Sequence, residues 1–146
     1  MSATQQMTQQ LVVFALGNEE YALPIQQVQE IIRYTEPRAV SSAEPWVRGV
    51  ISLRGKIIPV FDLGVRIGVH AEPGEDQKIV IIETESGTAG VVVDEVEEVL
   101  TVEAGQLDEI PGAGSDAIDA IAKIDDRLVV LLNPERLLAG ADEIYA

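Results

Sequence analysis

The chain has 146 residues, of which 47% are hydrophobic and 24% charged, as in folded globular domains rather than disordered chains. It has no cysteine, which excludes disulfides and thiol chemistry, and its net charge of −15 opposes binding to nucleic acid or anionic lipid. The polar start MSATQQMTQQ and the shortness of every apolar run predict a flexible tail over residues 1–10 and a cytoplasmic protein.

Short β-branched apolar runs follow one another along the chain, separated by turn-forming clusters. They are LVVFAL (11–16), EYALPI (20–25), VQEII (28–32), VRGVISL (47–53), KIIPVFDL (56–63), KIVIIE (78–83), AGVVVDEVEEVL (89–100), AIAKI (120–124) and RLVVLLN (127–133). This spacing predicts an all-β protein with closed or sandwiched antiparallel sheets. One short helix is expected at the C-terminus, over residues 134–146, with Asn133 as N-cap and Pro134 in its first turn.

An internal repeat organises these runs. VQEI at 28–31 and VEEV at 96–99 are offset by 68 residues, and the last strand of each half is offset by 71. Each half supplies about five strands, the number that a small barrel needs. We therefore predict a single domain over 11–146, made of two similar five-stranded barrels with lobes at 11–70 and 77–133.

The hairpin in GVISLRGKIIPVFDL (49–63) has an arginine at its tip, where the second half has aspartate. Leu53-Arg54-Gly55 aligns with Ile124-Asp125-Asp126, so the fold does not require the arginine. Trp46 is also confined to the first half, and it either plugs the end of the first barrel or contacts a partner. Gly49 is expected to permit a bulge or a close backbone approach.

The sequence offers no convincing catalytic or metal site. His70 is the sole histidine, in a charged loop that fixes no ligand geometry, and neither a G-x-S-x-G motif nor a phosphate-binding loop is present. The carboxylates Asp94, Glu95, Glu97 and Glu98 stand among Val92, Val96 and Val99, as on a solvated strand face. We therefore expect no enzyme, cofactor or metal, and a protein that acts through its surface. Strand alternation places Val28 and Glu30 on one face, a candidate contact patch.

Four stretches together resemble the CheW family of bacterial chemotaxis coupling proteins. They are FALGNEEYALPIQQVQEI, PWVRGVISLRGKIIPVFDL, AGVVVDEVEEVL and RLVVLLNPERLL, and the resemblance runs from about Leu11 to Leu138. It implies two pseudo-symmetric five-stranded SH3-like β-barrels that share a core. It also implies a non-catalytic adaptor that links the cytoplasmic tip of methyl-accepting chemotaxis receptors to the regulatory domain of the histidine kinase CheA. Such an adaptor is a monomer alone and forms arrays with its partners beneath the inner membrane.

The resemblance also implies receptor contacts in a groove between the barrels. They map onto Val28, Glu30, Gly49, Arg54 and Val99, whereas no residue is assigned to the kinase. Arg54 either contacts the receptor or braces the junction between the barrels.

One alternative keeps the fold and assigns the adaptor to a non-flagellar chemosensory pathway that controls pili or a second-messenger enzyme. A small-ligand or nucleic-acid-binding barrel is disfavoured by the charge and by the few aromatic residues, two Phe, three Tyr and one Trp.

Overall fold

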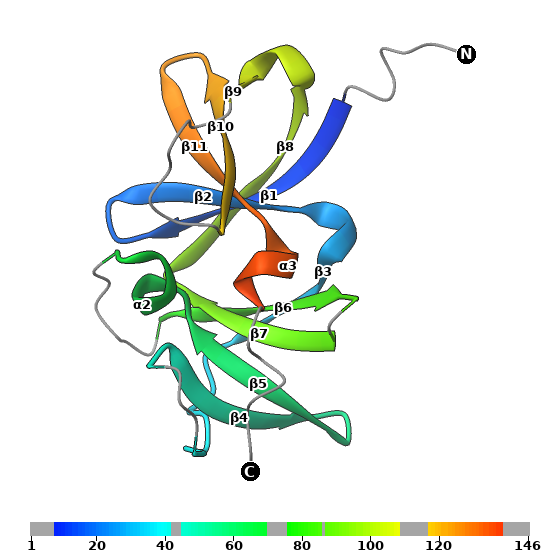
Figure 1. Ribbon diagram of the computed structural model, residues 1–146, viewed down its shortest axis with the longest axis vertical. Coiled ribbons are helices and arrows are strands. Elements are labelled where there is room, and N and C mark those ends of the chain that lie inside the picture. Colours follow the sequence, from blue (N-terminus) through cyan, green and yellow to red (C-terminus); the bar gives the residue numbers. More distant parts are fainter. Residues whose placement is uncertain (1–7, 42–44, 70–75, 86, 109–116, 139–146) are drawn as a thin grey trace.

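The computed structural model describes residues 8–41, 45–69, 76–85, 87–108 and 117–138, which form two β-sheets with short helices (Figure 1). The strands are β1 Thr8–Leu16, β2 Glu19–Pro24, β3 Val28–Arg33, β4 Val47–Leu53, β5 Lys56–Asp62, β6 Lys78–Thr84, β7 Gly87–Val93, β8 Glu95–Glu103, β9 Leu107–Asp108, β10 Ile118–Ile124 and β11 Arg127–Leu132. The helices are η1 Ile25–Gln27, α2 Leu63–Ile67, η2 Ala104–Gln106 and α3 Pro134–Leu137. The predicted tail over 1–10 is too long, because β1 already begins at Thr8.

The two sheets do not follow the two halves of the chain. The first sheet has the order β8-β1-β2-β11-β10-β9 and the second has the order β3-β6-β7-β5-β4, so each takes strands from both halves. The division into lobes at 11–70 and 77–133 is therefore corrected: the halves exchange strands. The exchange has a physical reason, because β2–β11 and β5–β7 pair in parallel and parallel neighbours cannot be joined by a tight turn.

The predicted repeat is confirmed by the strand orders. Replacing β1, β2, β8, β10 and β11 by β6, β7, β3, β4 and β5 converts the first sheet, apart from β9, into the second. The equivalence extends to single residues, since Val28 pairs with Ile82 and Val96 pairs with Phe14. One residue further along, both strands carry a bulge, at Gln29 in β3 and at Glu97 in β8. The fold is thus all-β, with two pseudo-symmetric SH3-like barrels.

Three apolar clusters hold the barrels together. One lies inside the first sheet and includes Leu11 and Val13, and one lies inside the second sheet and includes Ile79. The third cluster, here called the central core, takes side chains from both sheets and from α2 and α3. Trp46 belongs to the central core, where its ring meets Phe61 edge-on with centroids 4.7 Å apart. Trp46 is therefore a packing residue of the shared core.

Equivalent helices follow the last strand of each half. Asp62 accepts a hydrogen bond from the Val65 amide at 3.1 Å and so caps α2, and Asn133 caps α3 through the Arg136 amide at 3.1 Å. The predicted start of the C-terminal helix is confirmed, whereas its extension over residues 139–146 lies outside the described residues. Leu137 at its end is buried in the central core.

Gly49 lets the linker after β3 approach β4 closely. Arg38 and Val50 exchange two backbone hydrogen bonds, of 2.8 and 2.9 Å, beside this glycine. Gly49 has φ +149°, and a Cβ atom there would lie 2.1 Å from the Arg38 carbonyl oxygen. The close approach expected from the sequence is therefore present.

Gly49→Ala is expected to destabilise the fold far more than Gly87→Ala. Both glycines have φ values that cost an L-residue about 1–3 kcal/mol, but a Cβ at Gly87, with φ +130°, meets nothing within 4 Å. The backbone clash at Gly49 should add at least about 2 kcal/mol, measured as the difference in unfolding free energy in urea. Equal losses in the two variants would contradict this account of Gly49.

Candidate partner-binding site

The tip of the β4–β5 hairpin is a two-residue turn whose first residue is poorly suited to it. Arg54 and Gly55 have φ values of +52° and +83°, as in a type I′ turn, where Asn, Asp and Gly are preferred. The equivalent hairpin has Asp125 at φ +53°, a residue that this turn favours. Because an ordinary side chain in this conformation costs about 1–2 kcal/mol, the turn itself gives no reason for arginine.

Arg54 donates a hydrogen bond from Nη1 to the carboxylate of Glu30 on β3. The side chain of Arg54 is 74% exposed, whereas that of Glu30 is 23% exposed. The pair borders a small tip cavity of about 130 Å³, lined by Gln29, Glu30, Leu53, Arg54, Lys56, Ile58 and Thr88. Glu30 thus fixes the direction of the arginine, while most of the guanidinium surface stays open to a partner.

The equivalent place in the first sheet provides an internal comparison. There Glu98 is the counterpart of Glu30, and it binds Arg127 at 2.8 Å. Arg127 also forms two hydrogen bonds with Glu20, at 2.8 and 3.1 Å, and its side chain is only 35% exposed. Both barrels therefore join the bulged strand to the hairpin by an ion pair. Arg127 has its charge balanced by two carboxylates, whereas Arg54 retains exposed donors.

The carboxylates around Arg127 titrate unequally. Hydrogen bonding to Arg127 lowers the pKa of Glu20 below its ordinary value. A hydrogen bond with Glu20, with smaller contributions from burial and from the Glu20 charge, raises the pKa of Glu97 to about 7. This part of β8 therefore changes its charge near neutral pH.

A second cavity, here called the inter-barrel groove, lies where β3 and the start of β8 come together. Its volume is about 420 Å³, and it is lined by Ile31, Asp76, Lys78, Asp94, Glu95 and Val96. Asp94 has a structural role, because it accepts hydrogen bonds from the Gly17 amide at 2.8 Å and from Gln77 Nε2 at 3.1 Å. The exposed carboxylates of Asp76 and Glu95 remain at the rim of the groove.

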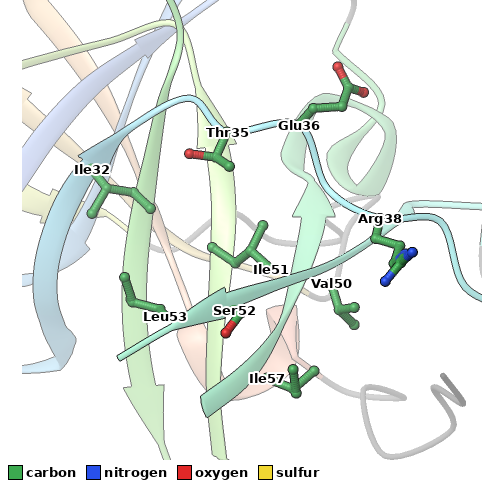
Figure 2. Close-up of a pocket in the computed structure, with 9 residues that line it drawn as sticks. All are labelled: Ile32, Thr35, Glu36, Arg38, Val50, Ile51, Ser52, Leu53 and Ile57. Atoms are coloured by element: carbon green, nitrogen blue, oxygen red, sulfur yellow. The ribbon is translucent and has the colours of Figure 1, made fainter. Parts of the chain in front are cut away.

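A third cavity, also of about 420 Å³, lies at the outer end of the second barrel (Figure 2). Ile32, Ile51 and Leu53 give it an apolar surface, and Glu36 and Arg38 come from the linker after β3. This outer cavity shares Leu53 with the tip cavity. Both cavities are therefore lined by residues of the edge strands β3 and β4.

The structure brings together two of the five predicted site residues, Glu30 and Arg54. Val28 is partly buried against the central core, and Gly49 is buried within β4, so neither presents a free side chain. Val99 lies on the first sheet, where it pairs with Val12 and is 52% exposed. The predicted alternation along β3 holds, with Val28 and Glu30 on its more buried side.

Sequence reasoning missed Ile31, which is 42% exposed and lines the inter-barrel groove. The internal repeat could have identified Ile31, because the offset of 68 residues that relates VQEI to VEEV makes it the counterpart of Val99, which is one of the predicted site residues. Lys56, the second cation of the tip cavity, was also missed. Being exposed at the start of β5, it had no pattern to distinguish it from a solubilising lysine.

Neither a candidate metal cluster nor a membrane-spanning helix occurs in the described part of the chain. No group of three or more His, Asp or Glu side chains is placed there to hold a metal ion. None of the described helices has the length and apolar character needed to cross a bilayer. The metal candidate His70 lies outside the described residues.

Comparisons with known proteins agree on one family. The family model described as the CheW-like domain matches residues 10–142. "Chemotaxis protein CheW" of Bacillus subtilis is 32% identical over 143 residues, covering 94% of this chain and 92% of that protein. "Protein PilI" of Pseudomonas aeruginosa is 29% identical over 84 residues, covering 57% of this chain and 47% of that protein. The crystal structure of the scaffolding protein TtCheW from Thermoanaerobacter tengcongensis matches with TM-score 0.82 at 32% identity, covering 90% of this chain and 88% of that one.

Glu97→Gln is expected to flatten the pH dependence of stability between pH 4.5 and 7. The raised pKa means that folded Glu97 keeps a proton that an ordinary carboxyl group, with pKa 4.5, has lost in the unfolded chain. The unfolding free energy therefore falls across this window as the pH rises. The lowered pKa of Glu20 acts in the opposite sense below pH 4.5, where its contribution is lost on acidification.

Urea unfolding at several pH values, with Glu103→Gln as control, would measure this effect. Glu103 is an exposed glutamate at the far end of the same strand. An unchanged pH profile in Glu97→Gln would show that the Glu20–Glu97 hydrogen bond does not hold in solution.

Proposed function

The chain belongs to the CheW-like family, and from this premise we propose that it is a non-catalytic adaptor in chemosensory signalling. It couples the cytoplasmic tip of methyl-accepting chemotaxis receptors to the regulatory domain of the histidine kinase CheA. It needs no cofactor or metal for this role, and it works at receptor arrays beneath the inner membrane. In this proposal Glu30, Arg54 and Val99 contact the receptor, and Val28 and Gly49 support that surface from within β3 and β4.

The observation that carries the proposal is the Glu30–Arg54 pair at the tip cavity. An arginine held in an unfavourable turn conformation, aimed by a carboxylate and still mostly exposed, is suited to donate hydrogen bonds to a partner. Its counterpart hairpin has aspartate instead, so the fold forms without arginine there. Gly49 and Val28 contribute indirectly: Gly49 lets the linker lie close to β4, and Val28 anchors β3 to the central core.

Of the two candidate roles for Arg54, the geometry favours partner contact over bracing. An ion pair whose arginine is largely exposed contributes about 0–1 kcal/mol, too little to fix the position of two barrels. The central core does this instead, because it takes large side chains from both sheets.

A second candidate is the same adaptor role in a non-flagellar chemosensory pathway that controls pili or a second-messenger enzyme. The partial similarity to PilI is the observation that favours testing it. Deleting the gene and scoring swimming chemotaxis against surface motility would separate the two pathways. Loss of swimming chemotaxis alone would exclude this second candidate.

Arg54→Asn is expected to weaken binding to a receptor cytoplasmic fragment by roughly tenfold, about 1.4 kcal/mol. Asparagine suits the turn, so the unfolding free energy should stay within about 1 kcal/mol of the original and kinase-domain binding should be unchanged. Calorimetric titration measures both affinities. The matched control is Lys123→Asn, which removes an exposed cation from the β10–β11 hairpin and should leave receptor affinity unaltered. Equal receptor affinity for Arg54→Asn and the original protein would contradict the assigned contact.

Co-sedimentation with the receptor fragment and the CheA regulatory domain, separately and together, tests the adaptor role as a whole. Binding to each, and enhanced recovery of the kinase domain with receptor when the adaptor is added, is the expected result. Absence of binding to both partners would overturn the proposal.

A further inference from the structure

The edge strand β3 separates two cavities of opposite charge. Glu30 on β3 lines the tip cavity, and the next residue, Ile31, lines the inter-barrel groove. Because Gln29 and Glu30 line one cavity and Ile31 lines the other, β3 forms the ridge between the two cavities. An α-helix with its side chains is about 10–12 Å across, so a helix lying over this ridge reaches both sides at once.

The tip-cavity side of the ridge is cationic. Lys56 and Arg54 both line the tip cavity and are exposed, and Glu30 balances only one of these two charges. In a chain with 25 acidic and 10 basic residues, such a local excess of positive charge runs against the overall balance.

The groove side of the ridge is anionic. Asp76, Asp94 and Glu95 line it against a single cation, Lys78. Asp94 is engaged by Gly17 and Gln77, so the carboxylates of Asp76 and Glu95 are the ones exposed toward a partner. The apolar part of this side is formed by Ile31 and Val96.

We propose that this dipolar surface selects the charge pattern of the receptor helix that docks on it. The helix presents an acidic side chain to Arg54 and Lys56 and apolar side chains to Ile31. On the other side of β3, it presents a basic side chain to Glu95 and Asp76. The proposal rests on the receptor-binding function proposed above and names the partner chemistry of that same site. A helix with the reverse order of charges would meet like charges on both sides of β3. Such like-charge contacts disfavour wrong partners and wrong orientations.

The experiment compares Glu95→Lys with Glu103→Lys, which makes the same charge change at the other end of β8. Binding of the receptor cytoplasmic fragment is measured at 50 and 500 mM salt, and folding is checked by urea unfolding. Glu95→Lys should weaken binding at least tenfold at low salt and much less at high salt, because salt screens exposed charges. Glu103→Lys should change the affinity less than twofold.

Charge reversal in the partner then identifies the contact. Each exposed lysine or arginine of the fragment is changed singly to glutamate, and at least one change should weaken binding to the original chain and restore binding to Glu95→Lys. Undiminished affinity in Glu95→Lys, or the absence of any restoring change, overturns the inference while leaving the receptor-binding function standing. Failure of the original chain to bind the fragment overturns that function and this inference with it.

Discussion

The central core is the constraint on which the rest of the structure depends. It joins both sheets, and it forms because β1, β2, β6 and β7 bury side chains on both faces. Phe14 and Val80 point into the central core, while Val13 and Ile79 point into the separate barrel interiors. A strand with two buried faces has no solvated side, which is why the corresponding sequence runs are continuously apolar. The strand exchange between halves follows the same logic, since neither half can complete its sheet alone.

This arrangement also fixes the edge strands that bear the candidate site. β3 and β8 occupy equivalent edges, each bulged at the same point and each paired with a strand buried on both faces. The repeat therefore separates what the fold requires from what is particular to one barrel. A glutamate paired with the hairpin occurs in both barrels, at Glu30 and Glu98, and belongs to barrel closure. An exposed arginine at an unfavourable turn position occurs in only one of the two equivalent hairpins, so the fold does not require it.

Local patterns predicted most of the elements, because hairpins, caps and strand alternation depend on neighbouring residues. The Asn133 cap, the Arg54-Gly55 turn and the repeat at offset 68 were all readable in this way. The strand exchange was not, because parallel pairing of Val130 with Tyr21 joins residues far apart in sequence and leaves no periodic signal. The same holds for the site: the sequence named Glu30 and Arg54, but only the fold shows that they meet.

The two equivalent edge strands, β3 and β8, differ in the charge of the side chains that follow their matching valines. An edge strand exposes unpaired backbone groups, and charged side chains protect it against unwanted pairing. Along β8, the positions after Val96 are occupied by two ionisable residues, Glu97 and Glu98, of which Glu98 binds Arg127 of the adjoining hairpin. The matching positions of β3 are Gln29 and Glu30, of which one is neutral and the other is paired. At these positions, side-chain charge therefore protects the edge of β8 against unwanted pairing more strongly than the edge of β3.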